Sequence, residues 1–170
     1  MRELIETLII TLGLYLAART ALQPFTVLGQ SMEPTLHNQQ YILVEKVSYW
    51  LHAPERGDVV VFKFPGNPSE DYIKRIIGVP GDHVVVGNGH VSVNGHQLTE
   101  SYIADPPDYT DDKTVPPGNL YVLGDNRDNS SDSHAWGLLP RSDVIGRAWV
   151  ALWPLTDLAL LRDPSYPGVR

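Results

Sequence analysis

After Pro24 the chain consists of short β-branched runs separated by turn residues, and this pattern constrains its fold more than any other feature. The runs are FTVLG, YILVEKV, DVVVFKF, YIKRIIGV, HVVVG, HVSVNGHQL, NLYVLGD and RAWVALW. Glycine, proline, asparagine and aspartate lie between them, as expected where strands end in turns. Asn94 and Gly95 between apolar flanks are a strong hairpin signal. The pattern predicts a mainly β fold, made of folded-over antiparallel sheets or a partly open β-barrel.

The rest of this body indicates a single domain. No second long helical period is present after Pro24, and neither an internal repeat nor a change of composition divides the sequence. Residues 103–118, which include DPPDY and TVPPG, have the composition of an extended surface loop. We therefore expect residues 23–170 to fold as one unit.

The residues before this body are apolar. Between Leu4 and Leu22 the only charged side chains are those of Glu6 and Arg19. A helix that crosses a bilayer needs about 20 mostly apolar residues, and long charged side chains near its ends can reach the headgroups. We therefore expect residues 1–22 to form a single membrane-spanning anchor. The flanking charges are few and mixed, so they leave its orientation open.

Two other interpretations of this segment fit it less well. A cleaved signal peptide favours a basic start, but Arg2 is followed at once by Glu3, and LAART is a loose match to a cleavage site. A buried amphipathic helix needs a polar face, and residues 8–18 have none beyond Thr11.

Composition excludes several kinds of partner and site. The net charge of −7 argues against nucleic acid, because proteins that bind it carry basic stripes. The chain has no cysteine, which excludes disulfides, thiolate metal sites and a cysteine nucleophile. The histidines show no metal-ligand spacing, so we predict no bound metal; they include His83, His90, His96 and His134.

Two residues in separate motifs are candidates for chemistry. Ser31 lies in GQSMEPTL, directly after a glycine-led turn, where a serine more often caps a backbone N–H group. Lys74 lies in the apolar run YIKRII, and strand alternation places its side chain and that of Arg75 on opposite faces. The ordinary role of such a lysine is to protect an edge strand from aggregation.

A third stretch, GDNRDNSSDSHAWG at residues 124–137, is a dense polar loop. Its simplest interpretation is a solvated turn. A calcium loop needs an oxygen ligand at position three and glycine at position six, but Arg127 and Ser130 occupy these positions. The loop also offers a His–Asp relay as a base for the serine, formed by His134 with Asp132 or Asp125.

A serine nucleophile needs a base, and lysine is the other possibility. The lysine pKa, near 10.4 in water, must fall to about 7–8, a change of roughly 3 units worth about 4 kcal/mol. Burial in an apolar strand lowers the pKa because desolvation disfavours the ammonium form, whereas a nearby carboxylate raises it. The run around Lys74 is a suitable host for such a base.

Taken in order behind one hydrophobic segment, GQSMEPTL, RGDVVVF, YIKRIIGVPGD and GDNRDNSSDSHAWG resemble the type I signal peptidases. The approach ARTALQPFTV also matches, and the resemblance extends from Leu4 to about Leu155. It implies the signal peptidase fold and a membrane-bound serine endopeptidase that removes signal peptides from secreted preproteins. It further implies an acyl-enzyme, no cofactor, and an anchor in the plasma membrane with residues 23–170 as the extracytoplasmic catalytic domain.

The resemblance also implies roles for individual residues. Ser31 matches the nucleophile, whose backbone N–H group is the expected oxyanion donor, and Lys74 matches the general base. Ser130 matches a serine whose hydroxyl holds the lysine amine. The loop residues that match the brace of the site are Asp125, Arg127 and Asp132.

Two positions depart from the family pattern. Gly29 stands where some members have a hydroxyl that assists oxyanion binding, so only backbone or water could help there. His134 stands where many members have arginine, which weakens the case for an ion pair with Asp132.

The family's substrates carry small side chains at the first and third positions before the cut. We expect such a chain to add as a strand to exposed edges in QPFTVLG and DYI, with alternate side chains in shallow pockets. The candidate substrate-binding residues are Phe25, Val27, Met32, Val44, Tyr72 and Ile73. Tyr49, Trp50 and Leu51 are candidates for contact with the membrane interface, and ordinary packing is their alternative role.

Two other functions stay open on the sequence. A self-cleaving repressor with a Ser–Lys dyad would need a DNA-binding segment, whereas this chain offers an apolar anchor and an acidic balance. A non-catalytic module that only binds signal sequences would be expected to lack Ser31 or Lys74, and both are present.

Overall fold

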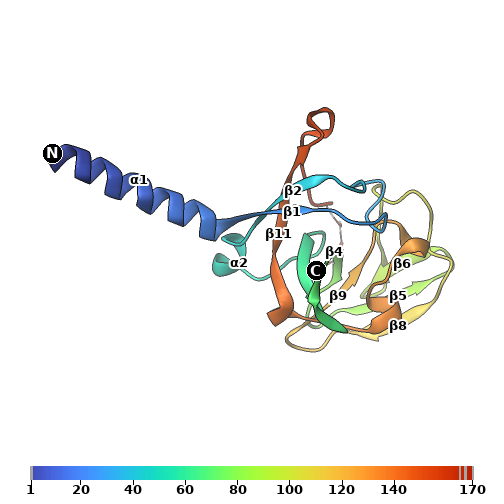
Figure 1. Ribbon diagram of the computed structural model, residues 1–170. Coiled ribbons are helices and arrows are strands. Elements are labelled where there is room, and N and C mark those ends of the chain that lie inside the picture. Colours follow the sequence, from blue (N-terminus) through green and yellow to red (C-terminus); the bar gives the residue numbers. More distant parts are fainter. Residues whose placement is uncertain (1, 165, 167, 170) are drawn as a thin grey trace.

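The computed structural model describes residues 2–164, 166, 168 and 169, and shows one long helix projecting from a β-rich body (Figure 1). The helix is α1 (Arg2–Ala21). The strands are β1 (Leu22–Thr26), β2 (Tyr41–Glu45), β3 (Val59–Phe64), β4 (Asn67–Gly78), β5 (His83–Gly87), β6 (His90–Val93), β7 (His96–Gln97), β8 (Asp111–Thr114), β9 (Asn119–Leu123), β10 (Leu139–Pro140), β11 (Val144–Trp153) and β12 (Ala159–Leu160). The short helices between them are α2 (Ser48–Leu51), α3 (Ser133–Trp136), η1 (Arg127–Asn129), η2 (Arg141–Asp143) and η3 (Leu155–Asp157). The predicted mainly β fold with one N-terminal apolar helix is confirmed.

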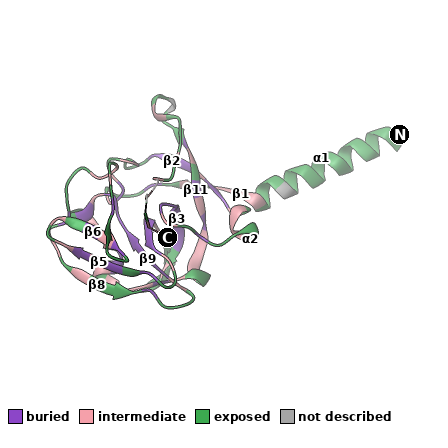
Figure 2. Cartoon of the chain, turned by 180° about the vertical axis from the view of Figure 1, so that it is seen from behind, coloured by how far each residue is buried: buried purple, intermediate pink, exposed green. Residues whose placement is uncertain are grey.

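Helix α1 is long and apolar enough to cross a membrane. Its described side chains up to Thr20 are exposed, and Figure 2 shows this exposure along its length. Strand β1 begins at the residue after the helix, and the backbone N–H of Lys46 donates to the Ala21 carbonyl over 2.9 Å. The end of α1 is therefore tied directly to the β body.

Two antiparallel sheets form the body in the described part of the chain. The larger has the strand order β1–β2–β11–β3–β4–β9–β10, with β12 paired to β11. The smaller has the order β7–β6–β5–β8. Long strand β11 pairs with both β2 and β3, and so brings β1 and β2 into the same sheet as β4.

Strand β3 shows why the larger sheet is apolar on both faces. Val59 and Val61 pack into one core cluster, whereas Val60 and Phe62 pack into another. This is the period of two expected of a strand, so a continuous apolar run is buried on both sides. A third cluster, which includes Val84 and Tyr121, joins the smaller sheet to β9 and β4.

The eight predicted runs all contribute strands, and the predicted hairpin is confirmed. Asn94 and Gly95 have φ angles of 53° and 80°, and they join β6 to β7 with Val93 opposite His96. Two consecutive positive φ angles are the requirement of a type I′ turn.

The prediction of an extended loop over residues 103–118 is wrong in part. Residues 111–114 form β8, which pairs with β5 through partners such as Asp111 and Val86. The sequence DDKT has neither apolar alternation nor β-branched enrichment, because only its backbone is needed to extend the sheet. Val115, also in this segment, is buried in the core.

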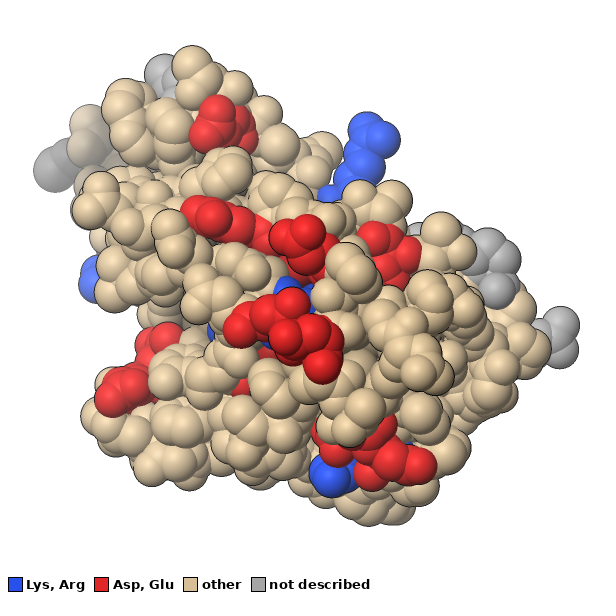
Figure 3. Space-filling model, turned by 90° about the vertical axis from the view of Figure 1, so that its right-hand side faces the viewer, with Lys and Arg blue, Asp and Glu red and all other residues tan. Residues whose placement is uncertain are grey.

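The surface carries the acidic excess of the composition. Acidic side chains are spread over one face of the molecule, with few basic side chains among them (Figure 3). Exposed large apolar residues lie on α1 and also on α2, where Trp50 is 67% exposed and Leu51 is 82% exposed. Since Lys46 contacts the end of α1 and α2 begins two residues later, these apolar side chains lie on the part of the body next to the helix (Figure 1).

Candidate active site

Ser31 and Lys74 lie 43 residues apart in the chain, and the fold brings their side chains into contact. Lys74 Nζ is 2.7 Å from Ser31 Oγ and 2.8 Å from the carbonyl oxygen of Ile73. Lys74 belongs to β4, whereas Ser31 lies in the turn that follows β1. The lysine side chain is buried and Ser31 is half-buried, so the pair lies at the edge of the core.

Burial is the main influence on the Lys74 amine. It lowers the Lys74 pKa from the usual value of 10.5 to about 8, because an ammonium group loses hydration in the protein interior. The negative charges of Asp132 and Asp125 act in the opposite direction, as expected of nearby carboxylates, but their effect is smaller. Roughly a tenth of the amine is therefore neutral at pH 7, and the neutral fraction rises on the alkaline side.

The polar loop at residues 124–131 holds the Ser31 backbone in place. The backbone N–H of Asn126 donates to the Ser31 carbonyl over 3.0 Å, and Asn126 Nδ2 donates to the Gln30 carbonyl over 3.1 Å. A Cβ atom on Gly124 would lie 2.5 Å from the Ser31 carbonyl oxygen and 2.3 Å from Ser130 Oγ. Only glycine allows the loop to approach the serine this closely.

Ser130 lies in the site, but its hydroxyl does not make the hydrogen bond to the lysine amine that the family resemblance led us to expect. Its Oγ atom is buried and has no hydrogen-bond partner in the described part of the chain. The Lys74 amine is directed instead to Ser31 and to the carbonyl of Ile73. The Ser130 side chain packs against the backbone of Gly124.

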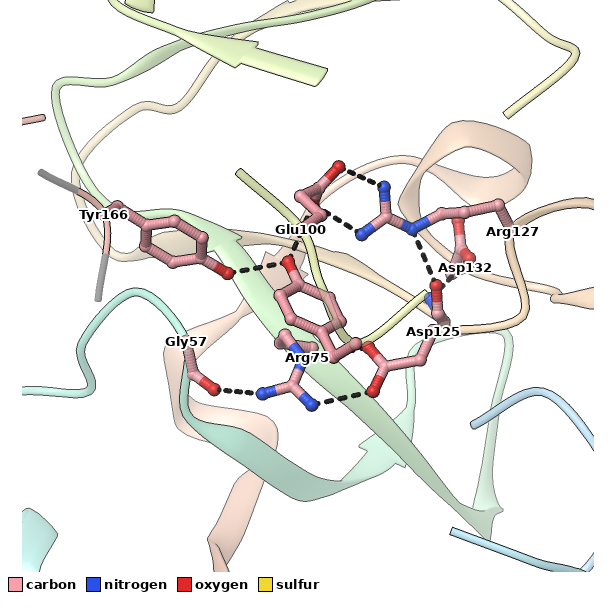
Figure 4. Close-up of polar contacts among 9 residues, drawn as sticks. Gly57, Arg75, Glu100, Asp125, Arg127, Asp132 and Tyr166 are labelled. Atoms are coloured by element: carbon pink, nitrogen blue, oxygen red, sulfur yellow. Dashed lines mark hydrogen bonds and ion pairs between the residues drawn. The ribbon is translucent and has the colours of Figure 1, made fainter. Parts of the chain in front are cut away.

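Asp125 and Arg127 each form a buried two-bond ion pair behind the site (Figure 4). Asp125 accepts from Arg75 over 2.8 and 2.7 Å, and Arg75 also donates to the Gly57 carbonyl over 2.8 Å. Arg127 donates to Glu100 over 2.9 and 2.7 Å and to the Gly124 carbonyl over 2.9 Å. Burial acts to lower the pKa of both arginines, but the hydrogen bonds and the negative charges of these carboxylates outweigh it, so the pKa of each arginine is raised.

Asp132 joins the loop to His134 despite the departure from arginine at that position. Asp132 accepts from the backbone N–H of Gly124 over 2.8 Å, and its other oxygen lies 2.7 Å from His134 Nδ1. The His134 ring stacks on Tyr109 with a centroid separation of 4.0 Å. In the described part of the chain, His134 makes no hydrogen bond to Ser31. The geometry therefore favours Lys74 over the His–Asp relay as the base for the serine.

A groove with a volume of about 640 Å³ lies beside Ser31 and Lys74. Residues 25–31 line one side and residues 70–74 line the other, so four of the candidate substrate-binding residues are in its wall: Phe25, Val27, Tyr72 and Ile73. Met32 and Val44 are not among the lining residues; both are buried in the core cluster that packs against Phe25 and Ile73, so their role in substrate binding stays a prediction.

Both walls of the groove include backbone that is free to pair. Strand β1 is at the end of the larger sheet. Strand β9 pairs with β4 only from Arg75 to Gly78, which leaves one edge of residues 71–74 without a strand beside it in the described structure. The edges predicted in QPFTVLG and DYI therefore face the same groove.

Several residues of the site were not identified from the sequence. Arg75, Glu100 and Tyr102 form the polar contacts behind the loop, and Tyr166 reaches them from the C-terminal segment. An arginine inside the apolar run of β4 is a signal that could have been used, since a buried cation requires a partner. Glu100 and Tyr102 follow a hairpin in a proline-rich region, where no periodicity marks them as buried.

Comparison with known proteins agrees with this geometry. The family described as "Signal peptidase, peptidase S26" matches residues 1–153. A probable signal peptidase I-2 from Synechocystis is 44% identical over 96% of this chain and 78% of its own length. The thylakoidal processing peptidase 1 of Arabidopsis thaliana is 40% identical over 86% of this chain and 49% of its own length.

A solved structure extends the similarity to the fold. The crystal structure of a signal peptidase I from Enterococcus faecalis matches this chain with a TM-score of 0.53 and 31% identity. The match covers 56% of this chain and 97% of the chain in the crystal structure. The chain therefore belongs to the signal peptidase I family, peptidase family S26, as a serine endopeptidase that removes signal peptides.

Proposed function

We propose that the chain cleaves signal peptides with Ser31 as the nucleophile and Lys74 as the general base. The observation that carries this proposal is the 2.7 Å contact between the serine hydroxyl and a buried amine whose pKa is lowered to about 8. A nucleophile and its base must be within hydrogen-bond reach, and the base must be unprotonated at working pH. The contact meets the first requirement, and the lowered pKa leaves part of the amine unprotonated near neutral pH.

In the proposed reaction the neutral Lys74 amine takes the Ser31 proton as the oxygen attacks the carbonyl carbon before the cut. The tetrahedral intermediate collapses, Lys74 gives its proton to the leaving amine, and the mature protein departs with that amine as its new N-terminus. Lys74 then takes a proton from water, which attacks the acyl-enzyme. As the bond to Ser31 Oγ breaks, Lys74 returns that proton to the serine oxygen and the signal peptide is released with a new carboxyl group.

The backbone of the serine turn supplies the proposed oxyanion donor, the N–H group of Ser31. Gly29 has no side chain to add, and its own backbone N–H donates to Asn38 Oδ1 over 2.9 Å. The hydrogen bond from Asn126 Nδ2 to the Gln30 carbonyl supports a fixed orientation for the peptide unit that carries this N–H group. A fixed donor aimed at the developing charge is worth far more than a mobile one.

The substrate is proposed to bind as an extended strand in the groove, paired with the backbone of residues 25–30 and 71–73. Alternate side chains of a strand point the same way, so the first and third residues before the cut would face the same wall. The apolar residues that line the groove are Phe25 and Val27 on one side and Tyr72 and Ile73 on the other. Shallow apolar pockets there would accept alanine and exclude larger side chains.

We further propose that α1 spans the plasma membrane once and that residues 23–170 lie on the extracytoplasmic side. The exposed Trp50 and Leu51 support this arrangement, because they lie on the part of the body next to the end of α1. Amphipathic aromatic rings are favoured at the membrane–water interface. The anchor would hold the groove close to the point where a signal peptide leaves the bilayer.

Cleavage of one preprotein in detergent extract tests the dyad. The substrate carries alanine at the first and third positions before the cut, and mass spectrometry identifies the product termini. Ser31→Ala and Lys74→Ala are expected to abolish cleavage, whereas the controls Ser92→Ala and Lys63→Ala on β6 and β3 keep it. Full activity of a folded Lys74→Ala variant would refute the dyad, and binding without cleavage by the native chain would indicate a non-catalytic module.

A further inference from the structure

The polar network behind the site contains two residues that the proposed reaction does not use, Glu100 and Tyr102. Glu100 Oε1 accepts from the Tyr102 hydroxyl over 2.7 Å and from Arg127 over 2.7 Å. The centre of the Arg75 guanidinium lies 4.2 Å from the centre of the Tyr102 ring. Tyr102 therefore contacts one buried arginine directly and the other through Glu100.

The C-terminal segment completes the environment of Tyr102. The hydroxyl groups of Tyr166 and Tyr102 lie 2.7 Å apart, and Figure 4 shows Tyr166 approaching this network from the side opposite Arg127. Pro164 packs close to Gly57, whose carbonyl accepts from Arg75. The family match ends at residue 153, so Tyr166 lies outside the segment that it covers.

This network holds the loop from Gly124 to Arg127 at both ends. Arg75 binds Asp125 on one side, and Glu100 binds Arg127 on the other. Between these two anchors the backbone N–H of Asn126 donates to the Ser31 carbonyl. Arg75 also follows Lys74 directly in β4, so both members of the proposed dyad are attached to elements that the network fixes.

We propose that Glu100 and Tyr102 are positioning residues. They act through Arg75, Arg127 and the loop to keep Ser31 and Lys74 within hydrogen-bond distance of each other. The proposal rests on the proposed function of the dyad. The Tyr102 ring shields the face of Arg75, and its hydroxyl fixes the Glu100 carboxylate that binds Arg127. Tyr166 holds that hydroxyl from the outside.

The physical reason is that both arginine–carboxylate pairs are buried, and a buried pair depends on complete surroundings. Loss of the Tyr102 ring would expose Arg75 to water and allow the loop from Gly124 to Arg127 to move. A displacement of about 1 Å at a reacting group can cost 10²-fold in rate. Water that reached the Lys74 amine would also move its pKa back towards the usual lysine value.

The test compares Tyr102→Leu with Tyr102→Phe in the full-length chain, purified in detergent, with Tyr121→Phe as the matched control. Tyr121 is buried and donates its hydroxyl to Asp111 of β8 over 2.7 Å, so this hydrogen bond lies outside the network of Glu100 and Tyr102. We expect kcat of Tyr102→Leu to fall tenfold or more with KM within twofold, because the groove is untouched. The acid limb of its pH–rate profile should move to higher pH, with a smaller loss in Tyr102→Phe, which keeps the ring.

Two results would overturn the inference: an unchanged kcat and pH limb in a folded Tyr102→Leu variant, or losses no greater than those of Tyr121→Phe at equal melting temperature. Tyr166→Phe removes a single hydroxyl and keeps the fold, and a reduced kcat is expected there as well.

Ser31→Ala in the same assay separates the two proposals. If it cleaves normally, the dyad and this inference both fall; if it is inactive while Tyr102→Leu and Tyr166→Phe match the native kcat, only the inference falls.

Discussion

The amine of Lys74 lies 2.7 Å from the hydroxyl oxygen of Ser31 while its side chain is only 4% exposed. The two properties come from different parts of the fold. Burial follows from the position of β4 inside the larger sheet, whereas contact follows from the turn after β1 and the polar loop that holds it. An amine in this position is costly to keep charged, and the same cost makes it available as a base.

The first prediction concerns the pH dependence of cleavage. With the Lys74 pKa at about 8, roughly a tenth of the amine is neutral at pH 7, and the fraction rises on the alkaline side. We therefore expect kcat to increase with an apparent pKa near 8, as measured in single-turnover assays across this range. Lys74→Arg should be inactive throughout, since a guanidinium does not lose its proton. A flat profile would exclude a titrating base.

The second prediction concerns stability. The Lys74 pKa is lower in the folded state than the usual 10.5, so the unfolded chain binds the proton more tightly, and stability is lost as pH falls through 10.5 towards 8. At 1.36 kcal/mol per pKa unit, this shift lowers the free energy of unfolding at neutral pH by about 3 kcal/mol. Lys74→Met should therefore be more stable than the native chain at pH 7, by less than this amount because the amine's hydrogen bonds are lost.

Thermal unfolding of both chains in one detergent at pH 7 and pH 10 measures this difference. The advantage of Lys74→Met should shrink at the higher pH, because the preference of the proton for the unfolded chain contributes less free energy as the pH approaches the usual lysine pKa of 10.5. Lys63→Met, at an exposed position of β3, serves as the control and should show no such pH dependence. An advantage of Lys74→Met that is equal at both pH values would contradict the burial argument.

The fold was largely predictable because its strands are apolar on at least one face. The run VVVF at residues 59–62 is buried on both faces, and the pair Asn94–Gly95 can adopt the positive φ angles of a tight hairpin. Strand β8 was missed because DDKT contributes backbone pairing and no apolar face. Sequence patterns report the burial of apolar side chains, and a strand held by backbone pairing and polar contacts does not produce such a pattern.

The site was predictable only where a residue type is unusual for its surroundings. A lysine in an apolar strand and a serine in a glycine-led turn could be singled out, and the structure brings these two residues together. The hydrogen-bonding state of Ser130 could not be derived from the sequence, because it depends on the directions of the side chains around the Lys74 amine. Glu100 and Tyr102 gave no signal, since their burial depends on the C-terminal segment that contains Tyr166.

A third prediction tests the close approach of the loop to the nucleophile. Gly124→Ala would place a Cβ atom 2.5 Å from the Ser31 carbonyl oxygen, so the loop and the serine must move apart. We expect kcat to fall by about 10²-fold, as for a displacement of about 1 Å. Gly87→Ala is the control, because the nearest atom to its added Cβ is 3.9 Å away. Equal kcat values for the two folded variants would show that the approach is not needed.

A fourth prediction concerns the buried ion pair between Arg75 and Asp125. Asp125→Asn leaves the Arg75 cation without its counter-charge in the interior, and breaking such a pair typically costs 3–5 kcal/mol. We expect a large fall in the free energy of unfolding measured with urea. Asp112→Asn, which removes an exposed partner of His83, should have little effect. A similar small loss in both variants would argue that water already reaches Arg75.

The last prediction concerns selection of the substrate by Ile73, which lies in the groove wall beside Lys74. Its carbonyl accepts from the Lys74 amine, so Ile73→Ala keeps the backbone contact of the base while it widens the pocket. One extra or missing methylene group in an apolar pocket is worth about 10–200-fold in selectivity. The kcat/KM ratio for leucine against alanine before the cut should therefore rise at least tenfold. Val85→Ala, at a half-buried position of the smaller sheet, should leave this ratio unchanged, and an unchanged ratio in active Ile73→Ala would remove Ile73 from the pocket.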